Sequence, residues 1–462
     1  CTWYGYDEVG RMDSVWTLLG DAGTGLGFSS PGYPSELVKP LSPEIVYRYD
    51  KRSLVDSTVM VEPGVVQRYH YGARKWLDSM TAIAGSDTVF SQKLEFDKTG
   101  NITKQVSKQK DTSEIAMVYD YDRISRIKLW STSGYSVMTG DRYSYDKVGN
   151  RVKRLVYDYD GPGDPAADTV NYSYGNGNNQ LTQVRHWSKP ETKNYWYTKD
   201  GALRLREKET KLAPTIYSLQ REVFVYGYNG LLKKFGTSTW SGSSIACMRD
   251  TVSPPQWQWE YRYSAGGERE SKRMVVAPLD DHSTLSHQWT YYLLSGSKQQ
   301  LAVYNGRETS ETDGCSNTDH RVHFYPVEYL TYGVGTSALI TTRPNQFREY
   351  KIVDHLGSTR VVLDTNGSIL STYDYEPFGK PLAKKGLDSR KSYVDKEQDK
   401  ESDLADHGAR KFDYETGRFT SVDMLWEKYR ELTPYQYSAN NPLVYRDLNA
   451  TVIGRGCMTD EQ

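Results

Sequence analysis

The sequence predicts an all-β protein built from repeated β-hairpins. An aromatic residue, a second aromatic two positions on and then a polar residue, most often Asp, recur in one frame, with Gly, Asn, Lys or Arg close behind. Side chains two apart lie on the same face of a strand, so each copy places two rings together. The clearest copies are Tyr4-Gly5-Tyr6-Asp7, Leu94-Glu95-Phe96-Asp97, Tyr119-Asp120-Tyr121-Asp122 and Tyr143-Ser144-Tyr145-Asp146, and weaker copies begin at Tyr172, Tyr195, Phe224 and Tyr261.

The residue after each aromatic pair predicts a turn. The Asp carboxylate can accept backbone N–H bonds two residues on, and the following Gly supplies a positive φ. The returning segments 102–106 and 151–157 alternate between apolar and polar residues, which indicates strands with one buried and one wet face. Since one hairpin is unstable alone, we expect the copies to stack edge to edge.

Composition favours a long sheet over a densely packed enzyme core. The chain has 38 Tyr against 10 Phe, and a Tyr ring can pack while its hydroxyl reaches water or a partner. The net charge of −1 offers no basic face, so we exclude nucleic acid as a partner.

The given range contains no apolar run long enough to span a bilayer and no export signal. We therefore expect a soluble chain. Because the first repeat begins at Tyr4, we interpret the first residue as a fragment boundary, with a lipidated Cys1 as the alternative.

No metal or cofactor is expected. Cys1, Cys247, Cys315 and Cys457 lack metal-ligand spacing and leave any disulfide pairing open. The carboxylates between 158 and 164 could suggest a calcium loop, but the Glu that should close such a loop is absent, which favours a solvated loop.

The motifs change in the last quarter of the chain. They are Asp354-His355-Leu356-Gly357-Ser358-Thr359-Arg360, Tyr373-Asp374-Tyr375-Glu376-Pro377-Phe378-Gly379, Gly408-Ala409-Arg410-Lys411-Phe412-Asp413, Thr416-Gly417-Arg418-Phe419-Thr420-Ser421-Val422-Asp423 and Asn440-Asn441-Pro442-Leu443. In order and spacing this series resembles the Rhs repeat-associated core domain. With the upstream Tyr-Asp repeats, nearly the whole chain resembles the Rhs or YD-repeat family, which includes bacterial polymorphic toxins, the C component of Tc toxin complexes and animal teneurins.

The resemblance implies a spiral β-sheet that forms a hollow shell, or part of one, closed by a core segment that turns inward as a plug. We assign 1–342 to the YD-repeat shell, 343–447 to the core domain and 448–462 to a short tail where family members carry a toxin domain. Within the core, the spacing of apolar residues between 425 and 432 predicts a short helix.

Several members of the family cut themselves just after the core with a pair of Asp residues. Two nearby carboxyl groups can share one proton, so that one activates water while the other acts as an acid. By motif, the pair falls on Asp399 and Asp423, with Arg410 as a supporting cation. Turn caps and a structural ion pair are the alternative for these three residues.

The predicted cleavage region is Asp447, Ala450 and Thr451. The family has Asp-Pro-x-Gly-Leu there, whereas this chain has Asp447-Leu448-Asn449-Ala450-Thr451. Pro fixes φ and Gly permits a tight bend, so their loss could leave this strand in a poor geometry for cleavage. In that case the protease would be inactive and the core would serve only as a plug. Any enzyme activity is at most self-cleavage. Asp354, His355 and Ser358 lie too close in sequence for a catalytic triad, which favours a turn-stabilising His.

Two functional classes follow. The first is the encapsulating shell of a secreted or injected bacterial toxin, whose partners would be its own toxin cargo or delivery-system proteins. The second is a cell-surface adhesion or recognition protein that binds glycans or proteins through its repeat surface. An interior cavity would favour the first class, and a filled interior with exposed aromatic residues the second.

Overall fold

The computed structural model describes residues 2–17, 42–133, 138–159, 168–175, 177–250, 257–275, 288–312, 318–335, 337–447, 449–451 and 453–455. Within these ranges the fold is almost entirely β, as predicted. It has one sheet of 28 strands, which we call the wall, two small sheets of four and two strands, one α-helix, α1 (Ile245–Asp250), and three short 3-10 turns.

Each wall strand pairs antiparallel with the strands before and after it in the chain, as stacked hairpins require. The first ten strands are β1 (Thr2–Tyr6), β2 (Met12–Thr17), β3 (Ile45–Tyr49), β4 (Val55–Met60), β5 (Val65–Tyr71), β6 (Leu77–Ala84), β7 (Asp87–Phe96), β8 (Ile102–Gln109), β9 (Ile115–Tyr121) and β10 (Ile127–Ser133). The next ten are β11 (Met138–Tyr145), β12 (Arg151–Tyr159), β13 (Asp168–Tyr174), β14 (Leu181–His186), β15 (Glu191–Tyr197), β16 (Leu203–Ala213), β17 (Ile216–Tyr226), β18 (Leu232–Gly242), β19 (Trp257–Tyr263) and β20 (Arg269–Met274). The last eight are β21 (Gln288–Leu294), β22 (Gln300–Thr312), β23 (Thr318–Tyr332), β24 (Ala338–Thr342), β25 (Arg348–Val353), β26 (Thr359–Leu363), β27 (Ile369–Tyr375) and β28 (Pro381–Gly386).

The turn predicted after each aromatic pair forms as expected. Between β11 and β12, Asp146 Oδ1 accepts hydrogen bonds from the amides of Val148, Gly149 and Asn150 at 3.0, 2.8 and 2.8 Å. Gly149 has a φ of 102°, a value that glycine adopts without steric cost. The same use of the Asp carboxylate recurs at Asp7, Asp97 and Asp122.

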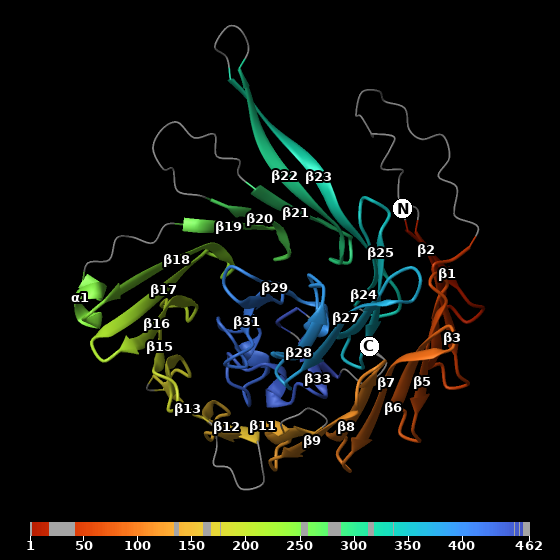
Figure 1. Cartoon of the computed structure of the whole chain (residues 1–462), viewed down its shortest axis with the longest axis horizontal. Coiled ribbons are helices and arrows are strands. Elements are labelled where there is room, and N and C mark those ends of the chain that lie inside the picture. Colours follow the sequence, from red (N-terminus) through yellow and green to blue (C-terminus); the bar gives the residue numbers. More distant parts are fainter. Residues whose placement is uncertain are drawn as a thin grey trace.

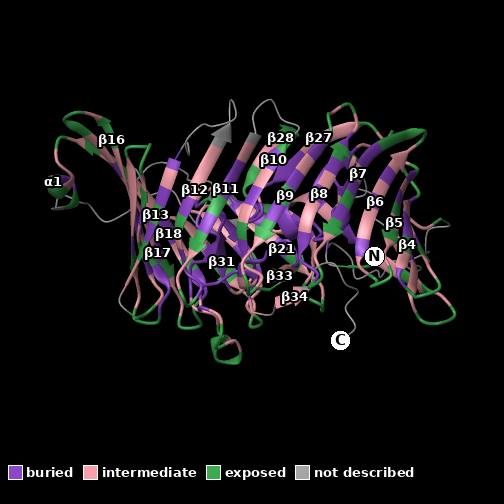
Figure 2. Cartoon of the chain, turned by 90° about the horizontal axis from the view of Figure 1, so that it is seen from below, coloured by how far each residue is buried: buried purple, intermediate pink, exposed green. Residues whose placement is uncertain are grey.

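The two aromatic residues of each repeat have different structural roles. The first ring is buried, as at Tyr143, with 3% of its surface exposed. In several repeats the second aromatic residue is a Tyr that donates its hydroxyl proton to a backbone carbonyl of the preceding hairpin, at the start of that hairpin's return strand. Tyr145 donates to Ile127 at 2.8 Å, and Tyr121 donates to Ile102 at 2.7 Å. These bonds join consecutive hairpins and need Tyr at these two positions, because Phe has no hydroxyl. Buried and exposed positions alternate along strands such as β9 (Figure 2).

The wall is an open spiral whose last turn lies inside its first (Figure 1). Among the described strands, β1 pairs only with β2 and β28 only with β27. Apolar side chains of β24 to β26 instead pack face to face on those of β2 to β7, in one cluster that includes Val15, Phe90, Ile340, Tyr350 and Val361. The overlap gives the sheet a double-layered sector without closing it into a barrel.

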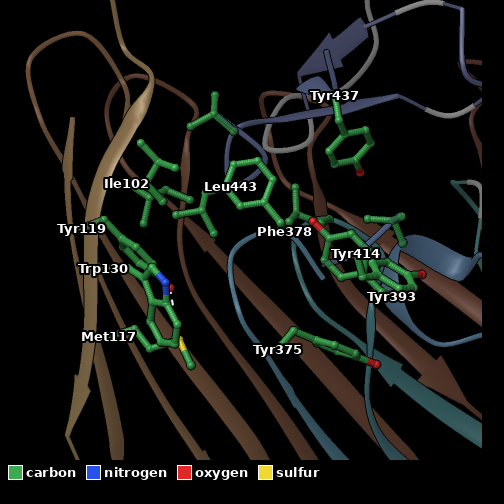
Figure 3. Packing of buried hydrophobic residues seen from close by; sticks show 14 of the residues in the cluster. Ile102, Met117, Tyr119, Trp130, Tyr375, Phe378, Tyr393, Tyr414, Tyr437 and Leu443 are labelled. Atoms are coloured by element: carbon green, nitrogen blue, oxygen red, sulfur yellow. Dashed lines mark hydrogen bonds between the residues drawn. The ribbon is translucent and has the colours of Figure 1, made fainter. Parts of the chain in front are cut away.

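Beyond β28 the chain turns inward and fills the centre of the spiral as the plug, as predicted (Figure 1). Figure 3 shows Trp130 and Met117 of the wall facing Tyr375 and the plug residues Tyr414 and Tyr437. One apolar cluster therefore joins three layers: wall, last turn and plug.

Two details of organisation emerge. The sheet runs through the boundary assigned at 342/343 and ends at β28, so that boundary stays a prediction. The short helix expected at 425–432 is instead a 3-10 turn, η2 (Trp426–Lys428), extended by i→i+3 bonds from Tyr429 to Trp426 and from Leu432 to Tyr429. Trp426 is 48% exposed, so no apolar face stabilises a longer helix there. No helix among the described residues has the length and apolar character needed to cross a membrane.

Replacing Asp146 with Ala tests the turn. The change removes four hydrogen bonds, including one from the Asn150 side chain at 2.9 Å, and we expect a loss of about 1–2 kcal/mol in the free energy of unfolding. Urea unfolding followed by tryptophan fluorescence measures it. Glu95→Ala is the control, because Glu95 is exposed and only pairs loosely with Lys104 at 3.5 Å. Equal effects of the two changes would contradict this role of the carboxylate.

Candidate functional site

All residues predicted for self-cleavage lie in the plug. A four-stranded sheet is formed by β29 (Glu397–Asp399), β30 (Leu404–Asp406), β31 (Lys411–Asp413) and β32 (Arg418–Phe419), and a two-stranded sheet by β33 (Tyr445–Asp447) and β34 (Ile453–Arg455). Asp399 ends β29, Arg410 precedes β31, Asp423 follows β32 and Asp447 ends β33.

Asp399 is fully buried among three cations. Arg269 Nη1 contacts both carboxylate oxygens at 2.8 and 2.7 Å, Lys272 Nζ lies 3.1 Å away, and Lys411 Nζ lies 2.7 Å away. Burial alone would raise the pKa of Asp399, but Arg269, Lys411 and Lys272 together hold it well below its usual value. Since Arg269 and Lys272 belong to β20, this carboxylate ties the plug to the wall.

A second pair of carboxyl groups meets at Arg410. The guanidinium Nη2 lies 2.7 Å from Asp423 Oδ2 and 3.3 Å from Asp447 Oδ2, and the group stacks on Phe419 at 3.7 Å from the ring centre. The same side chain donates from Nε to the carbonyl oxygen of Ala450 at 2.6 Å. One buried Arg therefore connects two carboxyl groups to the backbone of the predicted cleavage region.

Burial perturbs the ionisation of Asp447. Burial raises the pKa of Asp447 to about 6, against the lowering effect of Arg410, and the charge of Asp423 adds to the rise. The Thr451 backbone acts in the lowering direction, although the hydrogen bond of its amide goes to Asn449 Oδ1 at 3.3 Å. Asp447 can thus hold a proton in mildly acidic solution, three residues before the Ala450–Thr451 peptide.

The backbone at Ala450 is bent into the left-handed region. Ala450 has a φ of 62° and is fully buried, and Asn449 Oδ1 accepts hydrogen bonds from the amide and hydroxyl of Thr451 at 3.3 and 2.9 Å. This conformation costs a non-glycine residue about 1 kcal/mol. The chain therefore keeps, with Ala, the kind of bend that Gly permits, and presents its carbonyl to Arg410.

The structure brings only some of the predicted residues together. Arg410, Asp423, Asp447, Ala450 and Thr451 form one group. Asp399 draws its hydrogen bonds and ion pairs from other cations, and among the described residues none joins it to Asp423 or Arg410. The partnership of Asp399 with Asp423 stays a prediction, and the geometry favours Asp447 as the second carboxyl group.

Sequence reasoning placed Asp447 in the cleavage region but not in the carboxyl pair. It also missed His407, a fully buried residue whose Nδ1 lies 3.1 Å from the carbonyl oxygen of Asp447. Burial lowers the pKa of His407 well below its usual value, so the ring is neutral and donates through Nδ1. It fixes the backbone at the entrance to the cleavage region.

The other motifs have structural roles or lie outside the described residues. His355 contacts the carbonyl of Leu443 at 3.0 Å and Gln92 at 3.4 Å, while Asp354 Oδ1 accepts the amide of Ser358, so these three residues form a turn and no relay. Most of the 158–164 carboxylate loop lies outside the described residues, as do Cys1, Cys315 and Cys457.

Comparison with known proteins agrees with this architecture. The model of the teneurin YD-shell family matches residues 164–446, which is more than half of the chain. The chain belongs to this family. The resemblance to Rhs and YD-repeat proteins inferred from the motifs is therefore confirmed.

Individual relatives are more distant or much longer. Salivary gland surface protein 1 from Aedes aegypti is 35% identical over 189 residues, which is 40% of this chain and 5% of that protein. Among solved structures, a TcdB2–TccC3 complex with Cdc42 matches 97% of this chain and 30% of its own at 12% identity and a TM-score of 0.30. A Tc holotoxin pore from Photorhabdus luminescens matches 100% of this chain and 30% of its own at 13% identity, also with a TM-score of 0.30. The chain thus spans only a small part of each of these proteins.

Proposed function

We propose that the chain is the closing part of an encapsulating YD-repeat shell of the bacterial Rhs toxin type, and that its plug cleaves the chain just after the core. The family assignment supports a shell role. The observation that carries self-cleavage is the convergence of two carboxyl groups on Arg410, whose Nε donates to the carbonyl oxygen of Ala450.

The proposed reaction is hydrolysis of that peptide by an aspartic-protease mechanism. The Asp423 carboxylate takes a proton from a water molecule, whose oxygen adds to the carbonyl carbon of Ala450. Arg410 stabilises the negative charge that develops on the carbonyl oxygen. Protonated Asp447 gives its proton to the departing Thr451 nitrogen as the C–N bond breaks, and water supplies all the atoms that are added.

In this proposal the wall and plug hold the C-terminal continuation of the chain. Its partners are its own toxin cargo or delivery-system proteins, and its location is secreted or on a cell surface. The buried contacts of Asp399 and the aromatic cluster keep the plug seated after cleavage, because neither involves the residues beyond Ala450.

A second candidate function is recognition of glycans or proteins at a surface. Three observations favour it. The plug fills the centre of the spiral, and a filled interior with exposed aromatic residues is what this class predicts. Phe324 and Tyr325 on β23 are 54% and 55% exposed, and the relative from Aedes aegypti is named as a surface protein. Absence of any cleavage in the assays below would favour this second function.

The cleavage proposal predicts the outcome of three substitutions. A reporter domain is fused behind Gln462, and the products are identified by intact mass. The unmodified chain should be cut between Ala450 and Thr451, whereas Asp423→Asn and Asp447→Asn should stay whole, because each loses one of the two proton-transfer groups.

Asp399→Asn decides between the two possible carboxyl pairs. If Asp447 is the partner of Asp423, this variant is still cut whenever it folds, which circular dichroism checks. If Asp399→Asn folds and stays whole while Asp447→Asn is cut, the original pairing of Asp399 with Asp423 is correct and the role given to Asp447 is wrong.

The cleavage rate should depend on pH through Asp447. Since its pKa is raised to about 6, the carboxyl group holds its proton below that pH and loses it above, so the rate should fall about tenfold per unit between pH 7 and 8. Initial rates after refolding from urea at pH 5 to 8 measure this dependence. A rate that rises across the same range would contradict the assignment of Asp447 as the acid.

A further inference from the structure

A second cluster of charged side chains lies where the wall meets the plug, away from the cleavage region. A cavity of about 740 Å³ there is lined by β12 to β16 and by the plug. Three metal-ligating side chains meet in it: His186 from the end of β14, Glu191 from the start of β15, and Glu415 from the turn after β31. Their ligand atoms all lie within 4.8 Å of one another.

The orientation of His186 is fixed from behind by Asp168. His186 Nδ1 lies 2.6 Å from Asp168 Oδ2, and Asp168 Oδ1 accepts the amides of Trp187 and Ser188 at 3.1 and 2.9 Å. With Nδ1 bonded to Asp168, Nε2 is the nitrogen left for the cavity, an arrangement that recurs behind metal-binding histidines.

The carboxylates of Glu191 and Glu415, which lie near His186 Nε2, favour a cation at this place. Nε2 lies 3.7 Å from Glu415 Oε1, which is too long for a hydrogen bond. The carboxylate oxygens of Glu191 and Glu415 lie within 4.8 Å of each other and of Nε2, and two negative charges at this separation repel unless a cation lies beside them. Among the described residues, the ammonium of Lys193 supplies that charge, since it contacts Glu415 and lies 3.7 Å from Glu191 Oε1.

Lys193 has room and partners elsewhere in the cavity. Asp403 and Asp413 line the same space, and the charge of Asp413 acts on the Lys193 ammonium. The lysine can therefore move toward these carboxylates if another cation takes its place. Lys208 also pairs with Glu191, through Oε2 at 2.9 Å, which leaves Oε1 available.

We propose that His186 Nε2, Glu191 and Glu415 bind a zinc ion that replaces the Lys193 ammonium, with Asp168 orienting the imidazole. One imidazole, two carboxylates and a water satisfy the tetrahedral preference of zinc. Donors of such a site lie about 3.3 Å apart, so the side chains must close inward by roughly 1 Å, which rotation about their flexible bonds permits. Because Glu415 is in the plug and the other two ligands are in the wall, the ion would fasten the plug to its shell.

Zinc titration of the whole chain by isothermal calorimetry tests this site, after the cysteines have been alkylated so that they cannot bind the metal. The unmodified chain should bind one equivalent of zinc. His186→Gln and Glu415→Gln should abolish that binding, and Asp168→Asn should weaken it about tenfold or more. His70→Gln is the matched control, because His70 has the same 2.6 Å contact with an Asp, Asp78, but is exposed and has no pair of Glu residues in its cluster.

Lys193→Met provides the most specific result. Removing the competing ammonium should tighten zinc binding about tenfold, an effect that damage to the fold cannot produce. The proposal is wrong if the unmodified chain binds no zinc, if His186→Gln and His70→Gln bind it equally, or if Lys193→Met fails to strengthen it. None of these results depends on self-cleavage, so the two proposals stand or fall separately.

Discussion

The rest of the structure depends on the side-chain oxygen that closes the hairpin turns, a carboxylate in the Asp repeats and a hydroxyl at Thr198, Ser264 and Ser295. By accepting amides two and four residues on, as Asp146 does from Val148 and Asn150, it fixes where one strand ends and the next begins. A slip of one residue would move every side chain to the opposite face of the sheet, so this local bond sets the register of a 28-stranded wall. In several repeats the hydroxyl of the second aromatic residue then joins the hairpin to its predecessor, as from Tyr145 to Ile127 and from Tyr121 to Ile102. Regular stacking is the result, and the curvature of the stack encloses the plug.

The plug is held by two kinds of interaction that act on different sides. Aromatic rings from the wall, the last turn and the plug form one apolar cluster, which supplies most of the attraction. Buried charges supply position, because Asp399 is satisfied only where Arg269, Lys272 and Lys411 all reach it. Removing one partner of such a buried network is costly, so a displaced plug is unfavourable. This fixed position lets Arg410 hold the Ala450 carbonyl at a defined place.

Much of the fold could be predicted because its signals are local. The aromatic pairs, the turn Asp and the alternating return strands all lie within a dozen residues, and the motifs of the core identify the plug. The overlap of β24 to β26 on the first strands could not be predicted, because face-to-face packing leaves no pattern in a single sequence. Motif order suggested Asp399 as the partner of Asp423. In the structure Asp399 instead contacts Arg269 and Lys272, which lie more than a hundred residues away and which a single sequence does not link to it. The meeting of His186 with Glu415 is equally hidden, since it depends on how the plug is seated in the wall.

Wall and plug form one stable unit if they open only together, which hydrogen–deuterium exchange of the native chain can measure. The backbone of β31 in the plug should exchange as slowly as that of β9 in the wall, because both lie in the same buried cluster and can open only together. If β31 exchanges much faster than β9, the plug opens independently of the wall, and the proposed enclosure of the chain's continuation is contradicted.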